Sequence, residues 1–238
     1  IAAIGAVAKV LTKAEIYADT MAQKAMDDEY YKLQNKGTWD INRVRERSSV
    51  ENDALAKGKK IHVGRVFGIG VKKGAELPDD HPDQRYKGRY VFDGRRGYVK
   101  DDYNSTALFE ELGSSPATID SPKIIDFYGL LSGNSQEDAD ADQAYTQALL
   151  RGTETWVILP KEHWPAHFHQ YNCPIVPLIY SLYGHPDAGS FWEEKSHHQV
   201  LKQGFERLAE WSSMFWHAKL KLMLMIYVDD FRMAGPKD

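Results

Sequence analysis

The stretch KLKLMLMIYVDD, from Lys219 to Asp230, is the most informative segment of this chain. Its apolar run from Leu222 to Ile226 has the composition of a buried strand, and two adjacent carboxylates, Asp229 and Asp230, follow that run closely. Two carboxylates at the end of a buried strand repel each other, and partial removal from water raises the pKa of at least one. A hard divalent cation such as Mg²⁺ would neutralise them in a tight hairpin turn. The alternative is an ordinary polar turn, since Asp is common in turns.

A second acidic group lies upstream, in EDADADQAY. Asp138, Asp140 and Asp142 alternate there, and alternate residues of a strand share one face. If a strand carrying Asp140 ran beside the one that leads to Asp229, the carboxylates could share two metal ions about 4 Å apart. The alternative is an acidic surface loop, which would have the same sequence pattern.

The composition excludes several classes of protein. The chain has 238 residues, of which 42% are hydrophobic and 27% charged, as in globular proteins. Its single cysteine, Cys173, excludes an internal disulfide and suits a reducing compartment. No apolar run approaches the roughly 20 residues that span a bilayer. The first residue is Ile1 and not Met, and no signal-peptide pattern follows it, so we expect a piece of a longer product that is neither secreted nor associated with a membrane.

Charge is strongly segregated along the chain, although the net charge is only −4. Residues 57–100 hold 12 basic and 5 acidic side chains, whereas residues 101–160 hold 2 basic and 11 acidic ones. This arrangement suits a protein that binds a polyanion and also the cations that react with it. Two solvated faces of opposite sign are the simpler interpretation.

Hydrophobic periodicity and turn residues predict an α+β protein. We expect a helix over 1–35, a short strand within 37–44, a loop over 48–60, strands over 61–71 and 86–92, a helix near 121–132, a strand or strand-to-helix junction from Asp138, a strand at 155–160, a helix over 189–211 and a strand over 219–228. We expect Trp211, Phe215 and Trp216 to pack in the core or against a missing segment, in preference to stacking on bases.

Three ordered motifs make the chain resemble the reverse transcriptase domain of Copia-type retrotransposons. The first has Asp140 followed by Tyr145 and Gly152, the second has Leu182, Tyr183 and Gly184 followed by Trp192, and the third is Tyr227–Asp230, which reads YVDD. GTWD at 37–40 and YKGRYVFDG at 86–94 are weaker matches to the family's entry motif and fingers segment.

The resemblance implies a fingers-and-palm fold without a thumb. Residues 1–36 would be a helical lead-in, and residues 37–238 the fingers and part of a palm, whose antiparallel ferredoxin-like sheet has helices on one face. The implied activity is RNA-directed DNA polymerisation with two Mg²⁺ ions, or Mn²⁺. The implied partners are dNTP, an RNA or DNA template with primer, and other segments of a Pol polyprotein, in a cytoplasmic virus-like particle or the nucleus.

The resemblance also implies roles for individual residues. The metal ligands would be Asp140, Asp229 and the Ala141 carbonyl, with Asp230 as the neighbouring acidic residue. Tyr145 would be the steric gate that selects deoxynucleotides. Lys87 and Arg89 would contact the incoming triphosphate, because ammonium and guanidinium groups form charge-assisted hydrogen bonds to phosphate. An exposed alternating strand face is the other explanation for this basic pair.

The second motif departs from the family pattern. The family usually continues Leu182, Tyr183 and Gly184 with Leu-Lys-Gln, whereas this chain has His185, Pro186 and Asp187. An acidic Asp187 near a triphosphate would repel it.

Two other functional interpretations follow from these departures and from the acidic motifs. One is an inactive truncated remnant that at most binds nucleic acid. The other is a metal-dependent nuclease or nucleotidyltransferase of another fold. A separate cluster, consisting of His163, His167, His169 and Cys173, has zinc-ligand chemistry, but its spacing matches no standard zinc site.

Overall fold

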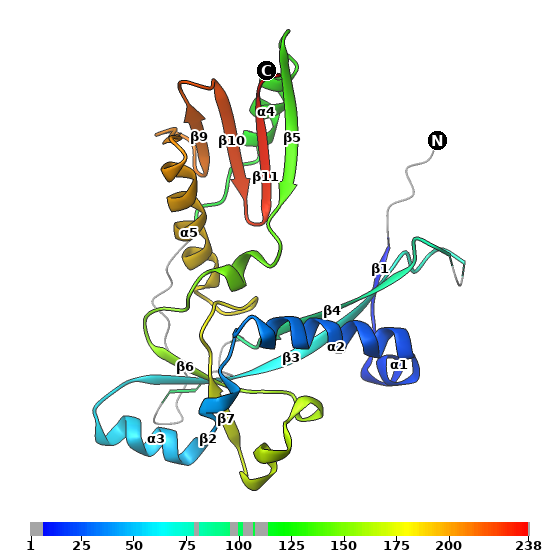
Figure 1. The fold of residues 1–238 in the computed structure, drawn as a ribbon, viewed down its shortest axis with the longest axis vertical. Helices are drawn as coiled ribbons and strands as arrows, with labels where there is room; N and C mark the ends of the chain where they lie inside the picture. The colour runs from blue at the N-terminus through cyan, green and yellow to red at the C-terminus, as the bar shows by residue number, and fades with distance from the viewer. Residues whose placement is uncertain (1–6, 79–80, 96–99, 102–106, 108–113, 238) are drawn as a thin grey trace. The chain divides into compact units, whose positions relative to one another are not determined.

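The computed structural model describes residues 7–78, 81–95, 100–101, 107 and 114–237 (Figure 1). The chain divides into two compact units, and each combines helices with mostly antiparallel strands, as expected for an α+β protein. The first unit comprises residues 1–108 and 151–185, and the second comprises residues 109–150 and 186–238. Within the described part of the chain, no helix has the length and apolar character needed to cross a membrane.

The first unit is built on a sheet with the strand order β1-β3-β6-β7-β2, and β4 pairs with the far half of the long β3. Its strands are β1 (Ala8–Val10), β2 (Arg45–Glu46), β3 (Ile61–Lys73), β4 (Arg85–Phe92), β6 (Glu154–Ile158) and β7 (Pro174–Pro177). Its helices are α1 (Lys13–Ala18), α2 (Thr20–Asn35) and α3 (Arg47–Ala56), with short 3₁₀ turns η1 (Ile41–Arg43), η3 (Lys161–His163) and η4 (Ala166–Gln170).

Helix α2 lies along the β3–β4 hairpin at close range. Asp19 caps the helix, because its side chain accepts hydrogen bonds from the first backbone N–H groups. The approach is closest at Gly88 of β4, where a Cβ atom would lie 2.5 Å from the carbonyl oxygen of Ala25. Only glycine fits this contact, and it lets Met26 and Tyr30 of the helix reach the core.

Three expectations for this unit are wrong. The short strand expected within 37–44 does not form there: Ile41–Arg43 make the 3₁₀ turn η1, and β2 begins only at Arg45. Residues 8–10, expected to be helical, form the edge strand β1, and residues 1–6 of the same expectation lie outside the described residues. Residues 48–60, expected to be a loop, largely form α3. Helix α3 buries only Val50 and Ala54, which pack with Ile61 and Trp156. Such a narrow apolar stripe in a polar segment gives little periodic signal. The strands expected at 61–71, 86–92 and 155–160 are confirmed as β3, β4 and β6.

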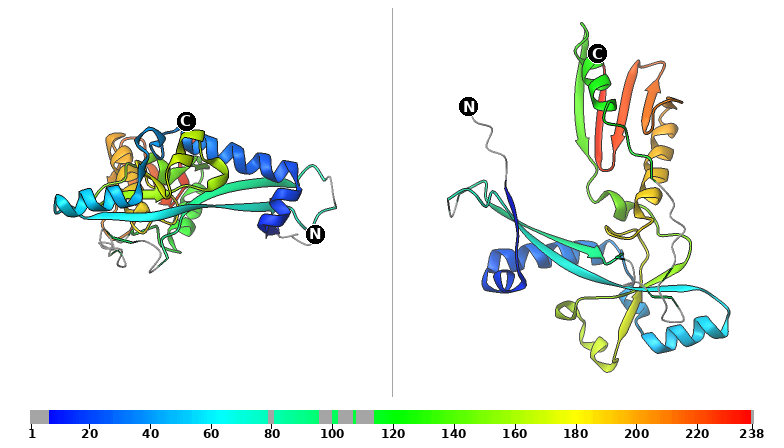
Figure 2. Two further views of the ribbon diagram at one scale, coloured as in Figure 1. Left: turned by 90° about the horizontal axis from the view of Figure 1, so that it is seen from below. Right: turned by 180° about the vertical axis from the view of Figure 1, so that it is seen from behind.

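The second unit contains an antiparallel sheet with the order β5-β11-β10-β9-β8. Figure 2 shows β5, β11, β10 and β9 side by side in its right-hand view. The elements are α4 (Ser121–Gly129), β5 (Asn134–Asp140), η2 (Ala144–Gln147), α5 (Ala188–Lys202), β8 (Glu206–Arg207), β9 (Met214–His217), β10 (Leu222–Tyr227) and β11 (Asp230–Pro236).

Each face of this sheet packs against a different helix. Met223 and Met225 of β10 belong to a cluster with Ile125 of α4, whereas Leu224 and Ile226 belong to one with Val200 of α5. The expectation that helices cover one face is therefore wrong. Strand β10 is apolar at successive positions, so both of its faces must be covered.

The helix expected over 189–211 ends at Lys202. Gly204 follows with a φ of +90°, a conformation that terminates helices, and β8 and β9 come next. Phe215 is fully buried, as expected, and Trp211 packs against the α4 side of the core. The strand predicted at 219–228 and the helix near 121–132 are confirmed as β10 and α4.

Candidate functional site

The pairing of β5 with β11 brings Asp140 next to Asp230. These two residues are direct partners in the antiparallel register, at the end of β5 and the start of β11. One residue further, the backbone N–H of Ala141 donates a 2.8 Å hydrogen bond to the carbonyl oxygen of Asp229. Carboxylates that are 89 positions apart in the sequence are thus held together by a continuous ladder of backbone hydrogen bonds.

A two-residue turn, Val228 and Asp229, joins β10 to β11. Val228 has a φ of +57°, in the left-handed region that glycine usually occupies at this place in a hairpin. A β-branched residue in this region costs about 1–3 kcal/mol, so neighbouring groups must hold it there.

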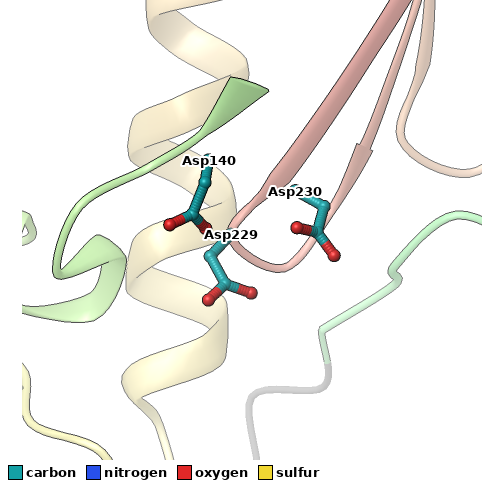
Figure 3. A group of neighbouring side chains, drawn as sticks. All are labelled: Asp140, Asp229 and Asp230. Carbon is teal, nitrogen blue, oxygen red and sulfur yellow. The ribbon is translucent and has the colours of Figure 1, made fainter. Parts of the chain in front are cut away.

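The turn and β5 together form an acidic triad of Asp140, Asp229 and Asp230 (Figure 3). One carboxylate oxygen from each residue lies within 4.8 Å of the others. Asp140 and Asp230 are exposed, and Asp229 is half-buried. Partial removal from water, followed by the charges of Asp229 and Asp140, raises the pKa of Asp230 above its usual range. The triad therefore carries an electrostatic cost that a cation would relieve.

The donor set fits a hard divalent cation. Three carboxylates offer only oxygen ligands, the kind that Mg²⁺ and Mn²⁺ prefer. Among the described residues, this is the only group of three or more His, Cys, Asp or Glu side chains close enough to bind one ion.

Two aspartates of the expected acidic strand have other surroundings. Asp138 accepts a 2.8 Å hydrogen bond from Arg232, which also bonds to Asp126 of α4. Asp142 lies beyond the end of β5, so it does not continue the alternating face. The other two members of the triad come from the β10–β11 hairpin: Asp229 lies in its turn, and Asp230 begins β11 opposite the end of β5.

Tyr145 lies near the triad. It belongs to η2 and is half-buried. Burial, with a smaller contribution from the charge of Asp229, raises the pKa of its hydroxyl. The structure thus places the residue expected to select the sugar within electrostatic reach of one expected metal ligand.

A cavity of about 900 Å³ adjoins the triad. Asp140 and Asp230 line it on one side, and Ile119 and Tyr227, both exposed, contribute apolar surface. The cavity therefore combines carboxylates with surface against which a sugar or base could pack.

Lys87 and Arg89 lie in the first unit, on the exposed face of β4. Arg85 shares that face, and none of the three forms an ion pair with another described residue. The structure thus shows the alternating basic strand face that the sequence suggests. The triphosphate contact of Lys87 and Arg89 stays a prediction.

The second motif packs against the end of β4. The carbonyl of Tyr183 accepts a 2.7 Å hydrogen bond from the N–H of Phe92. Gly184 has a φ of +88°, and a Cβ there would lie 2.1 Å from the carbonyl oxygen of Phe92, so glycine is required. Burial, with a smaller effect of His62, lowers the pKa of His185 to about 4.

Asp187 belongs to the second unit, where it is buried and precedes the first turn of α5. Its expected position near a triphosphate stays a prediction.

One histidine of the cluster in the first unit, His163, has a packing role, and among the described residues the cluster forms no group that could hold a metal ion. His163 stacks on Tyr30 with ring centroids 3.9 Å apart, and its ring shares a 2.6 Å hydrogen bond with the hydroxyl of Tyr90. Burial lowers the pKa of His163, which favours the neutral ring in this aromatic group.

Sequence reasoning did not find the roles of Trp192 and Arg232. The indole N–H of Trp192 donates a hydrogen bond to the carbonyl of Val228 in the turn. Arg232 joins β11 to both α4 and β5. The signal for Arg232 was its alternation with Asp230, whereas Trp192 stood out only as part of the second motif.

The chain matches no model of a known protein family, and no curated protein shows significant similarity to it.

Proposed function

We propose that this chain is the catalytic part of a template-directed DNA polymerase of the reverse transcriptase type. The observation that carries the proposal is the meeting of Asp140 with Asp229 and Asp230 at the end of an antiparallel sheet. Two features support a polymerase over other metal-dependent enzymes. The charge of Asp229 contributes to the raised pKa of Tyr145, and a cavity with acidic and apolar walls adjoins the triad.

The proposed reaction is attack of a primer 3′-hydroxyl on the α-phosphorus of a dNTP, with release of pyrophosphate. Bound Mg²⁺ would supply charge neutralisation and a lowered pKa for the attacking hydroxyl. Asp140 and Asp229 would hold the cations, and the Ala141 carbonyl would be a further oxygen ligand.

Side chains of both units would position the substrates. The ring of Tyr145 would occupy the space needed by a ribose 2′-hydroxyl. Lys87, Arg89 and the exposed face of β4 would bind phosphate groups. Positioning and electrostatic stabilisation account for most of the acceleration in this class of reaction.

The test is primer extension on a heteropolymeric RNA or DNA template with Mg²⁺ or Mn²⁺. Asp229→Asn and Asp140→Asn should each reduce nucleotide incorporation by about 10²–10³-fold or more, the scale of lost active-site electrostatics. Glu137→Gln is the matched control, because Glu137 lies on the same strand as Asp140 but outside the triad, and it should leave incorporation unchanged.

Three results would count against the proposal. Equal incorporation by parent and Asp229→Asn would contradict the assigned role of the triad. A parent chain that binds Mn²⁺ at the triad but extends no primer would favour the inactive remnant. Hydrolysis of nucleic acid without template dependence would favour a metal-dependent nuclease.

A further inference from the structure

Both carbonyl groups of the turn that presents Asp229 are held by hydrogen bonds from outside the hairpin. The N–H of Ala141, just after β5, donates to the carbonyl of Asp229. The indole N–H of Trp192, on α5, donates to the carbonyl of Val228. The turn is therefore fixed from the sheet on one side and from a helix on the other.

The turn needs this support because of its own backbone. Val228 has a φ of +57°, and β-branched side chains disfavour that region. Without support from neighbouring groups, Val228 would adopt its preferred negative φ. That change would rotate the peptide group between Val228 and Asp229 and redirect the Asp229 side chain. A hydrogen bond to the Val228 carbonyl opposes that rearrangement, because it fixes the plane of the peptide group that follows Val228.

Trp192 is well placed to hold the turn. It is buried, and its ring lies edge-on to Phe231 of β11, with centroids 6.5 Å apart. Burial limits the indole to one orientation, and its single N–H then points at one acceptor. Trp192 also lines a cavity of about 30 Å³ with Val228 and Tyr145, so little space is left for another arrangement.

We propose that Trp192 is a positioning residue of the acidic triad. Its indole N–H holds Val228 in the left-handed conformation, and this conformation places the Asp229 carboxylate beside Asp140. The inference rests on the proposed function for the purpose of the triad, but the turn geometry that it explains does not depend on polymerisation.

The experiment compares four forms of the full chain: the parent, Trp192→Phe, Val228→Gly and the double variant. Phenylalanine keeps an aromatic ring and removes the donor. Mn²⁺ alone is titrated, and binding is followed by the loss of the EPR signal of free Mn²⁺. Trp192→Phe should weaken Mn²⁺ binding about tenfold, as loss of groups that orient metal ligands does.

Val228→Gly distinguishes positioning from simple packing. Glycine adopts positive φ without strain, so the turn no longer needs the indole. The double variant should therefore recover most of the lost affinity, whereas a cavity left by a smaller ring would not be repaired by glycine. Trp216→Phe is the control, because Trp216 lies on β9 and packs against Tyr128.

The φ of Val228 gives a readout that needs no metal. NMR coupling constants should show positive φ in the parent and an altered φ in Trp192→Phe. Unchanged φ together with unchanged Mn²⁺ affinity in Trp192→Phe would overturn the inference, as would a double variant with no recovery. If Trp192→Phe fails to fold, the inference still predicts that the double variant folds and binds Mn²⁺. A double variant that does not fold, or does not bind Mn²⁺, would also overturn the inference. A parent that binds Mn²⁺ but extends no primer would contradict the proposed function alone.

Discussion

Asp93 and Asp230 are carboxylates in the two units, and their surroundings shift their pKa values in opposite directions. Asp93 is buried after β4, and Arg95 and Arg65 together lower its pKa to about 2. Asp230 lies close to two other carboxylates, and its pKa is raised. The first unit thus neutralises a buried acid with its own side chains. The second gathers three acids and leaves their charge largely uncompensated. This difference favours a structural role for Asp93 and a cation-binding role for the triad.

The largest effect on stability that follows from this comparison is at Asp93. Its folded pKa is about 2, below its ordinary value of 3.8, so its contribution is fully present above pH 3.8 and is lost as the pH falls through about 2. Asp93→Asn should lower the free energy of unfolding of the first unit by about 2 kcal/mol at neutral pH.

Urea unfolding at a series of pH values would measure this change in the free energy of unfolding. The difference between parent and Asp93→Asn should shrink between pH 4 and pH 2, where the parent loses its charge. Asp83→Asn is the control, because its side chain is 82% exposed. A pH-independent difference would show that the two ion pairs are not the cause.

A smaller effect is expected at Arg232, a cation whose charge acts on the triad by lowering the pKa of Asp230. Arg232→Gln removes hydrogen bonds to Asp138 and Asp126 and should lower the free energy of unfolding of the second unit by about 1 kcal/mol. Because Arg232 also lowers the pKa of Asp230, its loss should tighten Mn²⁺ binding.

Chemical unfolding and Mn²⁺ titration of Arg232→Gln measure both quantities, with Lys202→Gln as an exposed control. Weaker Mn²⁺ binding by Arg232→Gln would mean that the arginine supports the triad instead of competing with a cation.

The smallest effect is expected at Asp230 itself. Since its folded pKa is raised, ionisation costs stability as the pH rises above the ordinary value of 3.8. Asp230→Asn should therefore stabilise the metal-free chain at neutral pH, by no more than about 0.5 kcal/mol because the group is exposed and screened.

The gain from Asp230→Asn should vanish below pH 3.8 and when Mn²⁺ saturates the parent. Thermal unfolding with and without Mn²⁺ measures it, with Glu137→Gln as the control. A destabilised Asp230→Asn chain would contradict the uncompensated charge of the triad.

The parts of the structure that sequence reasoning predicts are those with a strong local signal. The apolar run before Asp229 and the alternating residues of β3 and β4 indicate strands directly. Helix α3 was missed because it buries only Val50 and Ala54. The short strand β1 was missed because it exists through its pairing with β3, and its own three residues carry no strand signal.

The candidate site could be predicted only in part. The adjacency of Asp229 and Asp230 is visible in the sequence, and alternation placed Asp140 on a strand, although β5 runs from Asn134 to Asp140 and does not continue to Asp142 as expected. The contact of Trp192 with the Val228 carbonyl could not be predicted, because it depends on how α5 packs on the sheet. The positive φ of Val228 was hidden as well, since valine rarely adopts it.

The most direct test of the shared cation site is paramagnetic broadening of backbone amide NMR signals by substoichiometric Mn²⁺. We predict that broadening centres on two segments together, residues 139–142 and 227–231, and that Asp140→Asn or Asp229→Asn abolishes it in both. Broadening of only one segment, or broadening centred elsewhere and unaffected by either substitution, would contradict the claim that these carboxylates share a cation.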